Sequence, residues 1–297
     1  MNQLNERAQL LRKPPWLKVR LPYAEECRKI KTTLAELQLH TVCQEAACPN
    51  VAECFASGTA TFLIMGNICI RDCLYCNVEH GKPAAVDENE INYLIDAVRK
   101  MKIEYIVITS VTRDDLPDGG AQVFSQCIGK LREALPARKI EVLIPDFQGN
   151  QAALEKVIAA KPDVINHNIE VVKPLLPQLR PQGNYNVSLE LIKKVAASSV
   201  ISKSGFMVGF GESHEDILQL IDDLASVSCA RLTIGQYQQP TLKHWPVAKY
   251  YHPDEFAEFK KIAYQKGFQY VEAGPLVRSS YHAAEAHEWG QGASSKE

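Results

Sequence analysis

TFLIMGNICIRDCLYCNV, residues 61–78, carries the strongest structural signal in this 297-residue chain. Its β-branched and apolar start predicts a buried strand at 61–66. Cys69, Cys73 and Cys76 follow at once with the spacing C-x3-C-x2-C. Three thiolates on one tight loop leave a metal position open, whereas structural zinc sites and electron-transfer 4Fe-4S centres use four protein ligands. The alternative interpretation is a structural zinc site completed by His80.

Five further apolar runs follow this strand, and stretches with helical periodicity lie between them. The predicted strands are 61–66, 104–111, 139–146, 163–170, 200–210 and 231–237. The predicted helices are 87–101, 120–135, 150–160, 188–199, 213–226 and 253–266. Strands this uniformly apolar indicate a parallel sheet that is covered on both faces and has right-handed crossovers. Six βα units of this kind fit either an open doubly wound sheet or a barrel.

Polar residues stand at the carboxyl ends of two of these runs, where ligand sites gather in parallel α/β folds. A lone His or Asn at such a position more commonly makes a loop hydrogen bond, so the shared edge is the evidence for a site. The polar residues are Asn166, His167, Asn168 and Glu170 at the end of the fourth run, and Gln236 and Tyr237 at the end of the sixth.

The composition indicates an ordinary globular protein. Hydrophobic residues make up 46% of the chain and charged residues 23%, which argues against disordered and collagen-like proteins. No apolar run approaches the roughly 18 residues that a membrane helix needs. The 33 basic and 35 acidic residues give a net charge of -2, so we expect neither a nucleic-acid partner nor a membrane partner. The N-terminal residues lack the apolar core of a signal peptide, which predicts a cytoplasmic location.

A second group of cysteines precedes the first strand. Cys43, Cys48 and Cys54 have the spacing C-x4-C-x5-C, so six of the nine cysteines fall within residues 43–76. A chain long enough to bury a full core does not need disulfides, so metal binding in a reducing compartment is the better interpretation. Two incomplete triads suggest two iron–sulfur clusters. The other cysteines, Cys27, Cys127 and Cys229, lie in apolar patterns and are predicted to be buried structural thiols.

These motifs together support a resemblance to a known family. The C-x3-C-x2-C loop after the first strand of a repeated βα chain, with Tyr75 before its last cysteine, resembles the radical S-adenosylmethionine superfamily. The upstream triad makes the chain resemble the lipoyl synthase family in particular, from about Arg12 to Ala283. The further segments that carry this resemblance are RKPPWL (12–17), SVTRDDLPDGGA (110–121), NHNIE (166–170), SGFMVGFGE (204–212), LTIGQYQQP (232–240) and RSSYHA (278–283).

The resemblance implies a fold and an activity. The α/β fold would be a partial (β/α)6 barrel at 61–270, with a cysteine-bearing extension at 1–60 and a C-terminal tail at 271–297 that folds back to the active site. The activity would be radical insertion of two sulfur atoms at carbons 6 and 8 of an octanoyl group attached to a lysine of a lipoyl carrier domain. Radical chemistry is needed because those C–H bonds have no acidifying neighbour.

The resemblance also implies the cofactors and partners. The cofactors would be S-adenosylmethionine and two 4Fe-4S clusters, of which the auxiliary one donates sulfur and is degraded. The partners would be octanoylated lipoyl carrier domains, a ferredoxin or flavodoxin that delivers electrons, and an iron–sulfur carrier that rebuilds the auxiliary cluster.

The iron ligands follow from the same resemblance. Cys69, Cys73 and Cys76 would hold the catalytic cluster. A serine of the RSSY segment would complete the auxiliary triad, and we assign this role to Ser280 in preference to Ser279. An oxygen ligand binds iron less tightly than a thiolate, so it could leave as the cluster is attacked.

Contacts to S-adenosylmethionine are assigned to the ends of the strands. Gly119 and Gly120 would receive its methionyl amino group, because glycine permits close backbone approach; loop flexibility is the competing explanation. Asn168 and Glu170 would face its ribose, and Arg180 would pair with its carboxylate through a planar guanidinium. Solvation of Arg180 at the surface is the alternative. Arg278 could hold the tail in place or could simply be exposed.

Three other functions remain open at this point. A related radical enzyme, such as a biotin-synthase-like or methylthio-transferring protein, lacks the C-x4-C-x5-C triad and the RSSY tail. A non-catalytic iron–sulfur relay gains nothing from an open iron, and a zinc scaffold would hold zinc instead of about eight irons. Gln238 stands where an apolar residue is common in the family, so substrate contacts at that position are in doubt.

Overall fold

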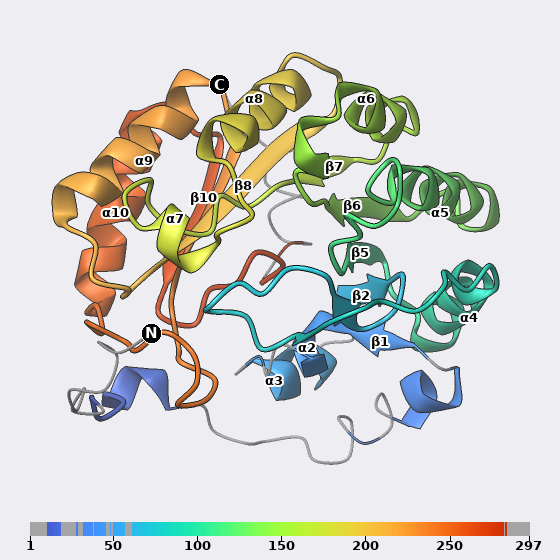
Figure 1. Ribbon diagram of the computed structural model, residues 1–297, viewed down its shortest axis with the longest axis horizontal. Helices are drawn as coiled ribbons and strands as arrows, with labels where there is room; N and C mark the ends of the chain where they lie inside the picture. The colour runs from blue at the N-terminus through green and yellow to red at the C-terminus, as the bar shows by residue number, and fades with distance from the viewer. Residues whose placement is uncertain are drawn as a thin grey trace, which may run out of the picture.

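A computed structural model describes residues 11–18, 28, 32–37, 39–45, 48, 50–56, 61–281 and 283. Its centre is a single sheet in which seven parallel strands follow one another in chain order, with one antiparallel strand at an edge (Figure 1). The parallel strands are β2 (Thr61–Ile64), β5 (Tyr105–Ser110), β6 (Lys139–Leu143), β7 (Val164–Asn166), β8 (Ile201–Val208), β9 (Arg231–Gln236) and β10 (Tyr270–Gly274).

The ends of this sheet do not pair with each other within the described residues. β1 (His40–Thr41) pairs antiparallel with β2 at one edge, and β10 pairs with β9 at the other. Strands in chain order with an opening between the edges make a partial barrel, which confirms the predicted fold class. The six predicted βα units are all present, and β10 adds a seventh parallel strand that was not predicted. Only Val271 of β10 is fully buried, so its sequence lacks the long apolar run of the other strands.

The long helices of the described chain form an outer arc around the sheet, as Figure 1 shows. Most lie within a few residues of their predicted bounds, but α8 begins three residues early because the Asn184 side chain caps it. The short helix α7 (Leu176–Leu179) was not predicted. The long helices are α4 (Glu90–Met101), α5 (Ala121–Ala134), α6 (Gln151–Ala159), α8 (Tyr185–Ala196), α9 (His214–Ser226) and α10 (Pro253–Gln265).

Short elements lie outside this repeat. The N-terminal extension holds η1 (Pro15–Leu17), α2 (Val42–Glu45) and α3 (Val51–Ala56), and α2 contacts β1 and β2. The cysteine loop includes the two-residue strands β3 (Ile68–Cys69) and β4 (Glu79–His80). A turn of 3-10 helix, η2 (Phe147–Gly149), follows β6. The extension therefore joins the barrel at its β2 edge, next to the cysteine loop.

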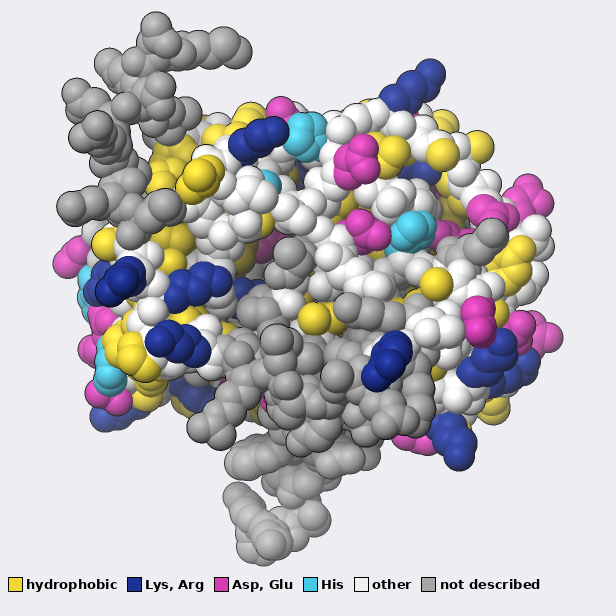
Figure 2. Space-filling model, turned by 90° about the horizontal axis from the view of Figure 1, so that it is seen from below, with side chains coloured by type: hydrophobic (Ala, Val, Ile, Leu, Met, Phe, Trp, Pro, Cys, Tyr) yellow, Lys and Arg dark blue, Asp and Glu magenta, His cyan; other side chains and the backbone are white. Residues whose placement is uncertain are grey.

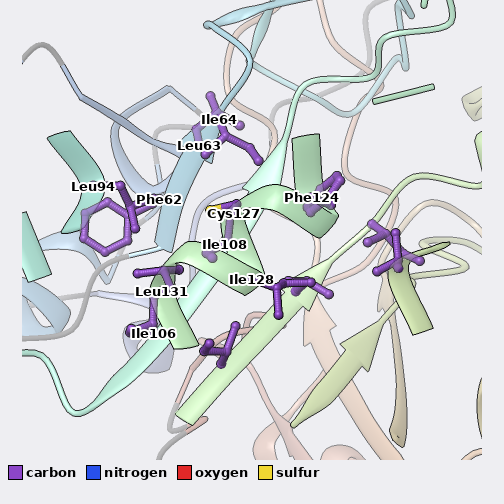
Figure 3. Close-up of a cluster of buried hydrophobic side chains, with 14 of the residues drawn as sticks. Phe62, Leu63, Ile64, Leu94, Ile106, Ile108, Phe124, Cys127, Ile128 and Leu131 are labelled. Atoms are coloured by element: carbon purple, nitrogen blue, oxygen red, sulfur yellow. The ribbon is translucent and has the colours of Figure 1, made fainter. Parts of the chain in front are cut away.

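The outward faces of the strands pack against the helices. Ile106 and Ile108 of β5 lie beneath Phe124, Cys127 and Ile128 of α5, and all five side chains are fully buried (Figure 3). Burial of this kind stabilises the fold by roughly 1.5 to 3 kcal/mol per large side chain.

The prediction of buried structural thiols is confirmed for two cysteines. Cys127 is 0% exposed and Cys229 is 4% exposed. Cys27 lies outside the described residues.

The inward faces of the strands carry buried charge, so the expectation of uniformly apolar strands is wrong on that side. Glu141 of β6 and Lys203 of β8 are 0% and 3% exposed, and their side chains form an ion pair of 2.8 Å. The Tyr105 hydroxyl donates to the same carboxylate at 2.7 Å. These partners satisfy the carboxylate, as a buried charge requires.

The chain after β10 crosses the opening of the barrel. A Cβ atom on Gly235 of β9 would lie 2.2 Å from the carbonyl oxygen of Val277, so the tail passes directly over this glycine. On either side of Val277 the tail contacts the N-terminal extension: Asn50 donates to the Leu276 carbonyl at 2.6 Å, and the Tyr281 hydroxyl donates to Glu53 at 3.0 Å. The tail thus joins the two edges of the sheet. The division at residues 60 and 270 stays a prediction, and β10 spans the second boundary.

Candidate active site between two cysteine triads

The cysteine loop begins with a turn that another element holds in place. Met65 and Gly66 follow β2 with positive φ angles of 65° and 88°. Both backbone N–H groups donate to the Glu90 carboxylate at the start of α4, at 2.7 and 3.4 Å. Glu90 is 8% exposed. Sequence reasoning missed this residue, since an acidic residue at a helix start is common and gives no hint of a distant partner.

The loop brings Cys69, Cys73 and Cys76 together as free thiols. The pKa of Cys76 is raised to about 12, chiefly by burial and to a smaller extent by the neighbouring thiols Cys73 and Cys69. Burial also raises the pKa of Cys73, which Arg180 partly opposes. Thiols with raised pKa values are protonated at neutral pH, so metal binding must release their protons.

Two other segments hold this loop from outside. The Leu74 N–H donates to the Leu179 carbonyl at 2.9 Å, and the Trp245 N–H to the Leu74 carbonyl at 2.9 Å. His244 Nε2 lies 3.0 Å from the Cys76 carbonyl oxygen. The long segment 237–252 between β9 and α10 therefore covers the cysteine loop.

Some of the polar residues at the carboxyl ends of the strands make only local hydrogen bonds within the protein. His167 contacts the Ile144 carbonyl and the Ser188 hydroxyl, both at 2.9 Å, and burial lowers its pKa to about 4. Gln236 donates to the Val208 and Lys249 carbonyls. For these two residues the interpretation as local hydrogen bonds is confirmed.

Asn168, Glu170 and Arg180 do lie together. Arg180 donates to the Asn168 carbonyl at 3.3 Å and to Asp146 at 3.4 Å, and it is 7% exposed. The alternative that Arg180 is solvated at the surface is therefore wrong. Burial raises the pKa of Glu170, although Arg180 and Asn168 lower it. The Asn168 side-chain oxygen is buried and has no hydrogen-bond partner among the described residues, so it can accept a bond from a ligand hydroxyl.

Gly119 and Gly120 both have a local reason to be glycine. Their φ angles are 60° and 90°, and a Cβ on Gly120 would lie 2.5 Å from the Met65 sulfur. The turn is fixed by Asp118, which accepts from the Gly120 N–H at 3.1 Å. A pocket of about 230 Å³ lies beside it, between residues 114–119 and 147–150.

The upstream triad forms a second group of thiols. The pKa of Cys54 is raised to about 12, chiefly by burial and to a smaller extent by the nearby thiols of Cys43 and Cys48. Cys43 is buried and its pKa is also raised by burial, whereas hydrogen bonds with Thr61 lower it. Within this triad the Cys48 N–H donates to the Cys43 carbonyl at 3.0 Å, and this hydrogen bond closes a backbone turn.

Ser280 reaches this triad through one shared neighbour. The Thr61 hydroxyl donates to the Ser280 oxygen at 2.7 Å, and Thr61 also contacts Cys43. Arg278 is partly buried and interacts electrostatically with Cys48 and Glu170, so the alternative of a simply exposed charge is wrong. The tail therefore brings a hydroxyl to one triad and a cation between the two.

The donor sets of both triads fit iron–sulfur clusters. Each triad offers three thiols, and the described residues place no fourth thiol with either group, which leaves one position for another ligand. Among the described residues, no three His, Cys, Asp or Glu side chains surround one point closely enough to hold a single metal ion. In a 4Fe-4S cluster each thiolate binds a different iron, so its ligands stand farther apart than those of one zinc ion.

The N-terminal segment packs on the same side of the barrel. Lys13 Nζ donates to the Gln238 side chain at 3.0 Å, and the Trp16 indole to the Tyr251 carbonyl at 3.2 Å. The segment 12–17 thus braces the chain that covers the cysteine loop. Gln238, where the sequence departs from the family pattern, serves here as the acceptor for Lys13.

Solved structures share this fold. S-adenosylmethionine-bound SuiB of Streptococcus suis superposes with a TM-score of 0.57, at 11% identity, over 76% of this chain and 54% of that chain. Methylornithine synthase PylB superposes with a TM-score of 0.53, at 10% identity, over 86% and 82%. Identities this low show the fold alone.

Sequence comparison identifies the family. Residues 63–224 match the model of the radical SAM superfamily, so the chain is a radical S-adenosylmethionine enzyme, a class that uses a 4Fe-4S cluster and S-adenosylmethionine. Residues 1–48 match the N-terminal domain of lipoyl synthase. The lipoyl synthase of Nitrosomonas eutropha is 48% identical over 97% of this chain and 93% of its own length. The lipoyl synthase of Roseiflexus sp. is 50% identical over 92% of this chain and 91% of its own length. The chain belongs to the lipoyl synthase family.

Proposed function

We propose that this enzyme inserts two sulfur atoms at carbons 6 and 8 of an octanoyl group that is amide-linked to a lysine of a lipoyl carrier domain. The observation that carries the proposal is the second cysteine triad with a tail hydroxyl beside it. Thr61 contacts both the Cys43 thiol and the Ser280 hydroxyl, although 219 residues separate Thr61 from Ser280. A triad completed by an oxygen ligand suits a cluster that gives up its sulfur.

The first triad would serve the radical step. Cys69, Cys73 and Cys76 would hold the catalytic cluster, which with S-adenosylmethionine supplies a 5'-deoxyadenosyl radical that abstracts hydrogen from the substrate. Arg180 would bind the carboxylate of S-adenosylmethionine, since it is buried and its guanidinium contacts Asn168 and Asp146 at this edge of the barrel. The unpartnered Asn168 oxygen and the Glu170 carboxylate would accept bonds from the ribose hydroxyls. Gly119 and Gly120 would leave room for the methionyl amino group.

The second triad would hold the sulfur source, which is a substrate of the reaction. Cys43, Cys48 and Cys54 would bind three irons of the auxiliary 4Fe-4S cluster and Ser280 the fourth. An oxygen ligand binds iron less tightly than a thiolate, so it is the ligand that leaves first. The Thr61 hydroxyl donates to the Ser280 oxygen at 2.7 Å and also contacts Cys43, which supports this assignment.

The partners follow from this chemistry. Octanoylated lipoyl carrier domains would be the substrates, a ferredoxin or flavodoxin the electron donor, and an iron–sulfur carrier the source of a new auxiliary cluster.

Acidic and basic side chains are interspersed on the described part of the face in Figure 2, where the N-terminal extension lies. No helix in the described part of the chain is long and apolar enough to cross a membrane. Free thiols such as Cys48 and Cys69 support a location in the reducing cytoplasm.

Matched cysteine variants test the two roles. Cys73→Ala should abolish formation of 5'-deoxyadenosine, because the catalytic cluster loses a ligand. Cys48→Ala should still form 5'-deoxyadenosine but no carbon–sulfur bond. Both products are measured by mass spectrometry on an octanoylated carrier domain, after anaerobic reconstitution and with iron counted per chain. Sulfur insertion by Cys48→Ala at the parent rate, with one cluster per chain, would overturn the proposal.

A further inference from the structure

An arginine inside the cysteine loop makes two double contacts that the sequence motif does not reveal. The Arg71 side chain is 2% exposed and lies between Cys69 and Cys73 in the chain. Its Nε and Nη2 atoms donate to Asp114 at 2.7 and 3.0 Å. Its Nη1 and Nη2 atoms donate to Asp146 at 2.8 and 2.6 Å. The guanidinium is thus shared between two carboxylates, each bound by a pair of hydrogen bonds.

These carboxylates come from two different strand ends. Asp114 follows β5 and Asp146 follows β6, so Arg71 joins the loop after β2 to the next two units of the barrel. Asp146 is 3% exposed, and Arg71 and Arg180 hold its pKa at about 2 in spite of burial. An aspartate so firmly ionised is a fixed negative charge at neutral pH.

Asp146 also contacts the arginine at the proposed cofactor site. Arg180 Nη2 lies 3.4 Å from Asp146 Oδ2, the oxygen that accepts from Arg71 Nη1. One oxygen of the Asp146 carboxylate therefore accepts hydrogen bonds both from Arg71 of the cysteine loop and from Arg180. Asp146 fixes η2 as well, because its side chain accepts from the Gln148 N–H at 3.0 Å. A movement of Arg71 displaces both the loop and Arg180.

We propose that Arg71 is a positioning residue, which holds the cysteine loop against the barrel and, through Asp146, sets the orientation of Arg180 for the carboxylate of S-adenosylmethionine. The inference rests on the proposed roles of the first triad and of Arg180. It adds a physical link between them, so that the cluster ligands and the cofactor contact are placed by one buried ion network.

The geometry explains why this residue must be arginine. The planar guanidinium can bind two carboxylates at once with paired hydrogen bonds, whereas lysine presents a single ammonium group. Two arginines and two aspartates also balance in charge, which makes the network tolerable in a dry interior. Removal of Arg71 leaves the buried Asp146 and the partly buried Asp114 without their shared cation, and Arg180 then remains as the cation that Asp146 contacts. Arg180 is then drawn toward Asp146 and away from the cofactor.

The test compares Arg71→Lys and Arg71→Met with Arg132→Met. Arg132 pairs with Asp163 at 2.8 Å at the opposite end of the barrel, and its side chain is 37% exposed. Hydrogen–deuterium exchange of residues 69–76 is measured in the metal-free proteins, which reports on the loop without any cluster. In reconstituted proteins, the KM for S-adenosylmethionine and the kcat for 5'-deoxyadenosine are measured separately, together with the change of the cluster EPR signal when S-adenosylmethionine is added.

Both Arg71 variants should exchange faster in residues 69–76, and kcat/KM for S-adenosylmethionine should fall roughly 10- to 100-fold, as expected for a misplacement of about 1 Å. Most of the loss should appear in KM, and the EPR change should weaken. Arg132→Met should match the parent in all three readouts.

Parent-like exchange and KM in Arg71→Lys would overturn the inference and leave the proposed function intact. A parent enzyme that forms no 5'-deoxyadenosine would instead overturn the proposed function. If Arg71→Met fails to fold, Arg71→Lys, which keeps the charge, decides the question.

Discussion

Replacement of Gly235 by alanine should separate sulfur insertion from radical formation. The new Cβ would lie 2.2 Å from the Val277 carbonyl oxygen, and real Cβ atoms essentially never approach another atom within 3.0 Å. The tail backbone must therefore retreat by about 0.8 Å, at the cost of roughly 1 to 3 kcal/mol that overpacking carries. Ser280 lies three residues farther along this tail, and a shift of this size lengthens its 2.7 Å contact with Thr61 to the limit of a hydrogen bond.

The assay has a stability arm and an activity arm. Urea unfolding of the metal-free Gly235→Ala protein should show a loss of about 1 to 3 kcal/mol in the free energy of unfolding. The reconstituted protein should still form 5'-deoxyadenosine, retain fewer irons per chain than the parent and make much less lipoyl product. The matched control is Gly129→Ala in the middle of α5, where an added Cβ meets nothing within 4 Å. That variant should gain roughly 0.5 to 1 kcal/mol and keep full activity.

Two results would refute the reasoning. Parent levels of lipoyl product and iron in Gly235→Ala would show that the tail does not need its place over β9. Equal loss of 5'-deoxyadenosine and lipoyl product would show that Gly235 acts on the first triad instead.

Three further outcomes are expected. Ser280→Ala should keep measurable S-adenosylmethionine cleavage but strongly reduce lipoyl product. Ser280→Cys should retain the auxiliary cluster yet impair sulfur release. Full lipoyl formation by both variants, at the thermal stability of the parent, would show that Ser280 is not part of the site. Asp146 has a folded pKa of about 2 against an ordinary 3.8, so it should contribute about 2 kcal/mol that is complete above pH 4 and lost as the pH falls toward 2. Urea unfolding of metal-free protein between pH 2 and 5 should show this slope in the parent and a shallower one in Asp146→Asn, and equal slopes would contradict it. Phe124→Ala, at a position that is 0% exposed, should cost about 3 to 5 kcal/mol in urea unfolding, and a cost below 1 kcal/mol would contradict the packing in Figure 3.

The repeated units were predictable from sequence because buried parallel strands and amphipathic helices leave local patterns. The long helices α4, α5, α6, α9 and α10 lie close to their predicted bounds for this reason. β10 escaped prediction because an edge strand with one fully buried residue has no long apolar run. The inward charges Glu141 and Lys203 contradict the apolar pattern, since a pair of opposite charges can be buried where either alone could not.

Spacing along the chain identified the candidate ligands but not what holds them. The two cysteine spacings, which are local, sufficed to predict two triads, and each triad consists of thiols that interact in the structure. Glu90, Asp146 and Thr61 were missed, because each acts through a partner that is 24 to 219 residues away in the chain. No periodicity or motif records such a contact.

The sequence by itself determined the family, the order of the first six parallel strands and the six long helices, and the positions of the six cysteines, because these depend on residue type and short spacing. Only the tertiary structure decided that Arg180 is buried beside Asp146, that Arg71 joins three strand ends, and that the tail over Gly235 brings Ser280 to Thr61. The physical reason is that hydrogen bonds and ion pairs reach only about 3 to 4 Å, so they exist only where folding has brought distant parts of the chain together.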